Sequence, residues 1–264
     1  MLQFSEAQLN AWIGGVFFPL ARVLALCAIA PAFGNRGVPA RVRLAIGVAL
    51  IFAVVPALNA VTPARPAAVI AIGSAHGLIT LATEILIGLA LGFAVRITFA
   101  AVDLAGELIG LQMGLSFASF YDPDNGGQST VLAEFLGLIT LLVFLATNGH
   151  LMLIELLVRS FDWLPVGRGL AVAPLAESLA RLGSLLFAAG LWLALPLIAA
   201  LLIVNIALAI LNRAAQQLNL FAVGFPVSLA TGFVGLSLLL PLLAPALQRL
   251  YGEGMSWIAM LAPR

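Results

Sequence analysis

Lysine is absent from this sequence of 264 residues, and all twelve of its lysine-plus-arginine positions are arginine. This absence excludes enzymes that depend on a lysine, such as P-loop nucleotidases and Schiff-base or pyridoxal-phosphate enzymes. A single cysteine, Cys27, excludes an intramolecular disulfide and any metal site built from paired cysteines. Because Cys27 lies among leucine and alanine, we interpret it as a small buried apolar side chain.

Charge is also scarce, since only 9% of residues are charged while 63% are hydrophobic, and the mean hydropathy is +1.16. Soluble chains carry roughly 25% charged residues, so these few cannot cover a water-facing surface. The net charge of +1 without a basic cluster argues against a nucleic-acid partner. Glu6 is the only charged side chain before Arg22, so we expect no cleaved signal peptide.

Long apolar runs predict membrane-spanning helices, because about 20 residues cross the ~30 Å hydrocarbon core. These runs predict an all-α, polytopic membrane protein of about six long hydrophobic helices in one membrane domain, with spans near 11–32, 44–63, 69–101, 135–154, 182–212 and 214–248. The last run would reach ~52 Å as a helix, far beyond a bilayer. Its faces are therefore expected to meet protein as well as lipid. Prolines should kink or break the last two helices, at Pro196, Pro226, Pro241 and Pro245.

Local charge pairs appear beside two of these runs. Glu155 and Arg159 are spaced i,i+4, as are Glu177 and Arg181, and each pair is predicted to interact on a helix. The connection 159–182 is long enough for a short interfacial helix, with Leu175, Leu179 and Leu182 on one face.

Small and charged residues form a stripe after residue 88. At 3.6 residues per turn, one narrow helix face carries Gly92, Arg96, Asp103, Glu107, Gly110 and Gly114. Glycine at this spacing lets helix backbones approach closely. The stripe is compatible with packing inside the chain's own helices and with a face toward other subunits or a pore. Arg96, Asp103 and Glu107 are the candidates for contacts with other subunits or a pore, because charges at membrane depth turn away from lipid.

A glycine-rich apolar segment follows, from residue 110 to 127. Pro123 disfavours helix at Asp122, and Asn125-Gly126 indicates a turn. Bulky apolar residues stand between the glycines, namely Met113, Leu115, Phe117 and Phe120. Large apolar groups expel water from a constriction, so this segment has the chemistry of a seal that can move. The alternative is a re-entrant connection filled by its own side chains.

An enzyme and a solute transporter are two alternative classes of function for this sequence. Ser116 and His150 resemble the nucleophile and base of an intramembrane serine protease, but no other polar group accompanies Ser116. Gly235-Leu-Ser237 repeats the same Gly-x-Ser pattern, so it arises easily in this composition and we predict no enzyme. The sequence has no metal-binding motif, and we predict no cofactor. Arg22 and Glu84 are candidate intramembrane charges of a permease, although we favour structural pairing of such carboxylates with arginines on other helices.

Specific stretches of the sequence resemble one known family. The block Gly106-Glu-Leu-Ile-Gly-Leu-Gln-Met-Gly-Leu-Ser-Phe-Ala-Ser-Phe-Tyr-Asp-Pro123 resembles the signature of the FliR family of flagellar type III export-gate proteins. Further matches are Pro19-Leu-Ala-Arg22 through Val38-Pro-Ala-Arg-Val-Arg43, Asn148-Gly149-His150, Leu211-Asn-Arg213 and Gly224-Phe-Pro226. Gln216 departs from the family, which often has proline there. SpaR, YscT and HrcT form the family's injectisome branch, and this sequence is more similar to the flagellar one.

The resemblance implies a function and a set of partners. One FliR subunit would join five copies of FliP and four of FliQ, and contact FlhB, in the inner membrane at the flagellar basal body. The resulting channel would pass unfolded flagellar proteins. Residues 1–102 would be FliQ-like, 103–130 the plug segment, and 131–264 FliP-like. The implied plug comprises Gly106, Gly110, Met113, Gly114, Leu115, Phe117, Phe120, Tyr121, Asp122 and Pro123. The alternatives are an injectisome export-gate subunit and a small-solute permease.

Overall fold

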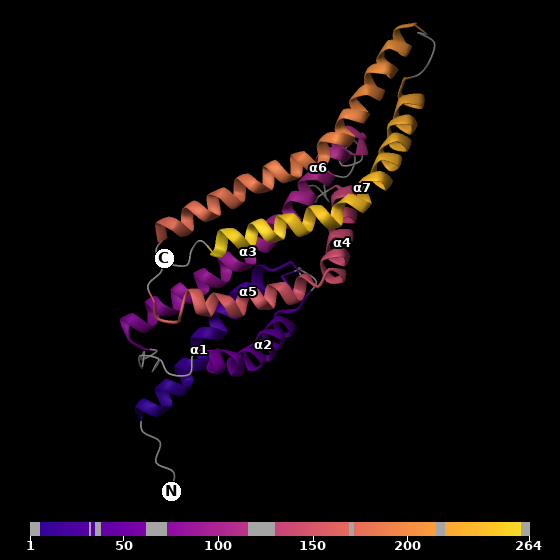
Figure 1. The fold of residues 1–264 in the computed structure, drawn as a ribbon. Helices are drawn as coiled ribbons and strands as arrows, with labels where there is room; N and C mark the ends of the chain where they lie inside the picture. The colour runs from indigo at the N-terminus through magenta and orange to yellow at the C-terminus, as the bar shows by residue number, and fades with distance from the viewer. Residues whose placement is uncertain are drawn as a thin grey trace. The chain divides into compact units, whose positions relative to one another are not determined.

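The structure, a computed structural model, describes residues 6–31, 33–34, 38–61, 73–115, 130–168, 172–214 and 220–259. Within these ranges the chain forms seven helices and no strand, which confirms the predicted all-α fold (Figure 1). The helices are α1 (Glu6–Ile29), α2 (Ala40–Val61), α3 (Ala75–Gln112), α4 (Val131–Ala146), α5 (Gly149–Trp163), α6 (Val172–Ala214) and α7 (Leu220–Ala259).

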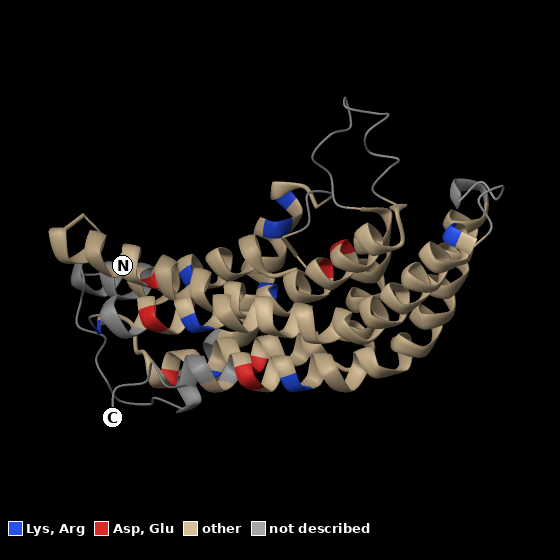
Figure 2. Cartoon of the chain, turned by 90° about the horizontal axis from the view of Figure 1, so that it is seen from above, with Lys and Arg blue, Asp and Glu red and all other residues tan. Residues whose placement is uncertain are grey.

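Three of these helices are long and apolar enough to cross a membrane: α3, most of α6 and most of α7. The pair α4 and α5 adds a fourth crossing if it is counted as one broken span. Lys and Arg, together with Asp and Glu, are sparse along the described helices (Figure 2). The predicted polytopic, all-α membrane protein is therefore confirmed.

The predicted fourth span is interrupted, because residues 135–154 do not form one helix. Helix α4 ends at Ala146 with Thr147 as its C-cap, and α5 starts at Gly149. Between them, Asn148 has a φ of 59°, in the left-handed region that asparagine tolerates better than most residues. The prediction of a continuous span was wrong, since Asn148-Gly149 provides the local geometry for a break.

Helix α6 is longer than predicted. Leu175, Leu179 and Leu182 do not form a separate interfacial helix, because α6 runs without interruption from Val172 to Ala214. The i,i+4 ion pair between Arg181 Nη2 and Glu177 Oε1, 2.7 Å long, lies in its first turns and confirms that pairing. Pro196 lies inside α6, and Pro226, Pro241 and Pro245 lie inside α7, so none of them ends its helix. Apolar helices tolerate proline where neighbouring groups satisfy the freed carbonyls.

The chain divides into two compact units, each of which is discontinuous in sequence. The first combines residues 1–96, 148–182 and 252–264, so it holds α1, α2, α5 and the first half of α3. Within it, α1 packs against α2, and α2 contacts α5. Cys27 is fully buried in this unit without a disulfide, as expected from its apolar surroundings.

The second unit combines residues 97–147 and 183–251, so it holds the end of α3, all of α4 and most of α6 and α7. Three buried aromatic rings pack edge to face in it: Phe144 lies between Phe99, with ring centroids 5.6 Å apart, and Tyr251, at 5.4 Å. Such pairs add about 0.5–1.5 kcal/mol each to the free energy of apolar burial. This aromatic cluster ties α4 to the end of α3 and to the last part of α7.

Candidate functional site

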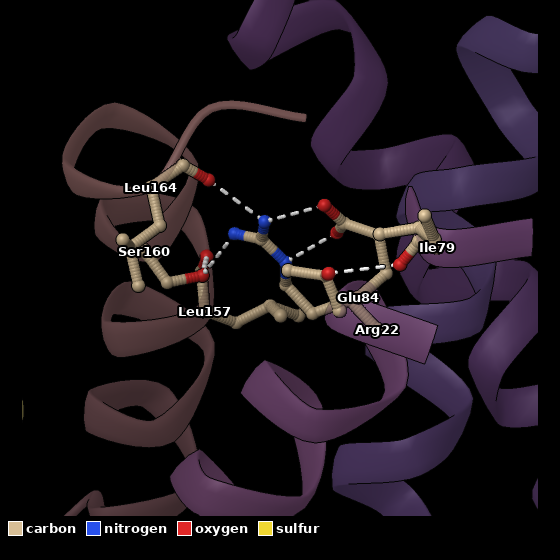
Figure 3. A network of polar contacts seen from close by, with 7 residues as sticks. Arg22, Ile79, Glu84, Leu157, Ser160 and Leu164 are labelled. Atoms are coloured by element: carbon tan, nitrogen blue, oxygen red, sulfur yellow. Dashed lines mark hydrogen bonds and ion pairs between the residues drawn. The ribbon is translucent and has the colours of Figure 1, made fainter. Parts of the chain in front are cut away.

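The most unusual group in the first unit is a fully buried ion pair. Arg22 on α1 donates from Nε to Glu84 Oε2 over 2.7 Å and from Nη2 to Glu84 Oε1 over 3.0 Å (Figure 3). The two side chains are 0% and 1% exposed. Both carboxylate oxygens of Glu84 therefore accept from one guanidinium, the bidentate geometry that gives the strongest charge-assisted hydrogen bonds.

The remaining donors of Arg22 reach the end of α5. Nη1 donates to Ser160 Oγ over 3.0 Å, and Nη2 donates to the backbone carbonyl of Leu164 over 2.7 Å (Figure 3). Leu164 is the C-cap of α5, where unpaired carbonyls and the helix dipole favour a positive charge. Arg22 Cζ also lies 4.1 Å from the ring centroid of Phe161, within the range of a cation–π contact.

This arrangement joins three helices through one side chain. Arg22 belongs to α1, Glu84 to α3, and Ser160, Phe161 and Leu164 to α5 and its cap. The interpretation that Glu84 pairs with an arginine on another helix is confirmed. A buried charge pair of this kind is strongly destabilised when one partner is removed, so it specifies how the three helices meet.

Glycines bring α3 close to its neighbours at both ends of the helix. In the first unit, a Cβ at Gly88 would lie 2.8 Å from Ala25 Cβ, and one at Gly92 would lie 3.0 Å from the Leu26 carbonyl oxygen of α1. In the second unit, a Cβ at Gly106 would lie 2.6 Å from Ala133 Cα of α4. Gly92 of the predicted stripe is therefore used for packing within this chain, as are Gly88 and Gly106 of the predicted glycine spacing.

The charged residues of the stripe are less enclosed. Arg96 and Glu107 are exposed, and Asp103 is half-buried beside Gly137, where a Cβ would lie 3.0 Å from Asp103 Oδ1. Gly92 and Gly110 of the stripe are thus buried against other helices, whereas Arg96 and Glu107 are exposed.

The proposed plug residues fall in two groups. Gly106 and Gly110 are buried in the last turns of α3, Met113 is 1% exposed just after it, and Gly114 follows with a φ of 81°. Leu115 is half-buried. The other predicted plug residues lie outside the described residues, namely Phe117, Phe120, Tyr121, Asp122 and Pro123. Ser116 of the protease alternative also lies outside them.

Sequence reasoning missed several contacts. The partners of Arg22 on α5 were not predicted, although Ser160 beside Phe161 is a lone hydroxyl on a buried helix face. A hydrogen bond between α6 and α7 was also missed: Ser228 Oγ donates to Asn205 Oδ1 over 3.2 Å. Isolated polar residues inside apolar runs are the signal that would have indicated both sites.

Metal-binding groups and the histidine of the protease alternative can be assessed in the described ranges. No group of three His, Cys, Asp or Glu side chains that could hold a metal occurs there. His150 Nδ1 is buried and has no hydrogen-bond partner in the part of the chain that the structure describes. The observed chemistry is that of helix packing and charge neutralisation.

Comparison with known proteins identifies the family. Residues 13–254 match the family described as bacterial export proteins, family 1. Flagellar biosynthetic protein FliR of Escherichia coli K12 is 45% identical over 253 residues, which cover 96% of this chain and 94% of that protein. FliR of Bacillus subtilis is 33% identical over 216 residues, 81% of each chain. The chain therefore belongs to the FliR family of bacterial export proteins and is a membrane-embedded component of the flagellar export apparatus.

Proposed function

We propose that this chain is one subunit of the flagellar type III export gate, which assembles with FliP and FliQ around a channel for unfolded flagellar proteins. The exposed apolar surface of α6 carries the proposal. Only 17% of its most apolar stretch is buried, and Trp192 is 80% exposed. A helix of 43 residues reaches ~64 Å, about twice the thickness of the hydrocarbon core. Lipid covers part of such a helix, and neighbouring subunits cover the rest.

The same surface continues on α7 and α4 in the second unit. Large apolar side chains are exposed along both, including Phe233, Val234 and Leu238 on α7 and Leu138 and Leu142 on α4. Exposed apolar area of this extent marks interaction sites in proteins. In the proposed assembly these faces contact FliP, FliQ and FlhB, and the exposed Arg96 and Glu107 together with Asp103 contact other subunits or the pore.

The segment from Gly106 to Pro123 is the proposed plug of the channel. Its bulky residues are apolar, and apolar side chains keep water out of a narrow passage. Gly114, whose φ of 81° suits glycine, offers a point of rotation just after α3. The division into a FliQ-like part, residues 1–102, and a FliP-like part, residues 131–264, belongs to the same proposal.

We also propose that the chain belongs to the flagellar branch of the family and lies in the bacterial inner membrane. FliR proteins from Escherichia coli, Bacillus subtilis and Aquifex aeolicus all bear flagellar names, and their identities of 45%, 33% and 33% support this branch over the injectisome one.

Affinity purification from native membranes in mild detergent tests the assembly. A tagged copy of the chain is expected to retain FliP and FliQ, with several copies of each per tag by quantitative mass spectrometry. A matched variant with Leu202 and Ile203 of α6 replaced by serine should retain less of them, because both side chains are at least half exposed and apolar. A chain recovered alone, or one that takes up solutes into liposomes without partners, would support the permease instead.

A further inference from the structure

Helix α5 has one buried, mostly apolar face and one exposed face that carries charge. Its buried residues follow the helical repeat and share one side of the helix: Gly149, Leu153, Leu156, Leu157, Ser160 and Phe161. Glu155, Arg159 and Asp162, spaced i, i+4 and i+7, lie on the opposite side, and all three are exposed. Together they form the charged face of α5, which runs from the middle of this amphipathic helix to its last turn.

The buried face of α5 is covered by its own chain. Arg22 of α1 donates to Ser160 Oγ and lies over the Phe161 ring, and α2 also contacts α5. Leu156 and Leu157 are at most 1% exposed. An amphipathic helix that rests on a membrane surface needs a free apolar face to insert among the lipids. The apolar face of α5 is already occupied, so the helix does not lie on a bilayer in this way.

Lipid is also a poor neighbour for the charged face. Charged side chains at membrane depth turn toward protein or water, because hydrocarbon does not solvate them. Helix α4, directly before α5, shows the contrast. Beyond Glu134 in its first turn, the exposed residues of α4 are apolar, and they include Leu138 at 61% and Leu142 at 65%. The exposed side of α4 therefore suits lipid or an apolar subunit surface, whereas the charged face of α5 suits neither.

Water fits the charged face better than a tightly packed subunit does. Glu155 Oε1 and Arg159 Nη2 are 2.6 Å apart, and the side chains are 54% and 58% exposed. Covering such a pair takes both charges out of water, which is unfavourable unless the cover supplies new hydrogen bonds. A face that carries both signs of charge, partly neutralised by its own exposed pair, holds a passing acidic or basic segment only weakly. Conduction through a passage requires contacts of this weak kind.

We propose that the charged face of α5 is part of the wall of the aqueous passage and contacts the exported polypeptide in transit. The occupant is an extended chain that carries both polar and apolar side chains. Leu151 and Met152, which are 54% and 36% exposed in the first turns of α5, offer it apolar contact beside the charges. This inference rests on the proposed function, because it assigns a stretch of the passage wall to one described helix.

Single cysteines in a Cys27→Ala background, which removes the native cysteine, test which medium covers each helix. Glu155→Cys, Asp162→Cys and, on α4, Leu142→Cys are treated in membrane vesicles of either orientation with a charged, membrane-impermeant methanethiosulfonate. The thiolate is the reacting form, and it forms in water rather than in hydrocarbon. We expect the two α5 variants to react about tenfold faster than Leu142→Cys, although residues 155 and 142 are similarly exposed in the chain. Equal rates contradict the proposal.

A stalled substrate distinguishes the passage from water outside it. An exported protein fused to a domain that does not unfold is produced in the same cells, and labelling is repeated. Glu155→Cys is expected to react about fivefold more slowly, because the stalled chain blocks access to the thiol. Glu177→Cys is the matched control, since Glu177 is 64% exposed and pairs with Arg181 at the same i,i+4 spacing, and its rate should not change. No protection at residue 155, or equal protection at both residues, overturns the proposal.

An export assay tests the same face without labelling. Replacing Glu155, Arg159 and Asp162 together by leucine would suit lipid or an apolar subunit surface, but it makes a passage wall adhesive. Export is therefore expected to fall about fivefold while FliP and FliQ stay bound, whereas leucine at both Glu177 and Arg181 should leave export within about twofold. Parental export by the triple variant contradicts the proposal.

Recovery of the stalled substrate with the tagged chain separates this inference from the proposed function. A substrate that is recovered but does not protect residue 155 refutes only the assignment of α5. A substrate that is not recovered with the chain at all refutes the proposed function as well.

Discussion

Replacing Glu84 with glutamine removes one charge from the buried pair and leaves the other in place. Arg22 would keep Ser160 Oγ, the Leu164 carbonyl and the Phe161 ring, but it would lose its counter-ion at 2.7 Å. Breaking a buried ion pair by removing one partner costs about 3–5 kcal/mol. That loss changes the folding equilibrium by a hundredfold to several thousandfold, because about 1.4 kcal/mol corresponds to a factor of ten.

Unfolding of the purified protein in detergent, followed by circular dichroism as dodecyl sulfate is added, measures this loss. Glu155→Gln is the matched control, because its ion pair with Arg159 is 2.6 Å long but its side chains are 58% and 54% exposed. An exposed pair contributes about 0–1 kcal/mol, so this control should stay close to the parent chain. Replacing Arg22 and Glu84 together by methionine should cost less than either single replacement, since no unpaired charge remains.

Equal effects of Glu84→Gln and Glu155→Gln would refute the reasoning. So would additive losses in the double variant, because additivity means that the two side chains do not interact.

Three further predictions concern single contacts and use the same unfolding titration. Gly88→Ala should destabilise the protein by about 1–3 kcal/mol, because its new Cβ would lie 2.8 Å from Ala25 Cβ. Gly183→Ala is the control: a Cβ there meets open space, so this variant should be neutral or stabilising. Tyr251→Phe should not destabilise the protein, because the buried Tyr251 hydroxyl has no partner among the described residues. Tyr251→Leu should destabilise it, because it removes the ring contact with Phe144, worth about 0.5–1.5 kcal/mol, and part of the buried apolar area. Asn205→Ala should cost about 0.6 kcal/mol through loss of the Ser228 hydrogen bond, and a stabilised variant would contradict that bond.

The helices could be predicted because apolar runs and local spacing encode them. The ion pairs Glu155–Arg159 and Glu177–Arg181 formed as predicted, since i,i+4 residues are neighbours on any helix. Helix ends were less predictable, because Asn148 breaks a run that is apolar on both sides while α6 continues through Gly183 and Pro196. Whether such residues end a helix depends on tertiary contacts that the local sequence does not contain.

The contacts of the candidate site depend on residues far apart in the chain. Arg22 and Glu84 are 62 positions apart, and Arg22 and Leu164 are 142 apart, so no spacing rule connects them. The sequence indicated that a buried charge needs a partner but could not identify Ser160 or Phe161. Likewise, glycine spacing on α3 indicated close packing, but the partner of each glycine became evident only in the fold.

The central claim is that an apolar segment after α3 seals a conduit through the assembled gate. Replacing residues 116–122 with an equal length of glycine and serine removes the apolar side chains and leaves Met113, Gly110 and Thr130 unchanged. Membrane potential is then recorded with a fluorescent dye in cells that produce the variant or the parent chain at equal levels. The account predicts depolarisation with the variant that disappears when FliP is absent, whereas full membrane potential with an assembled variant gate would contradict it.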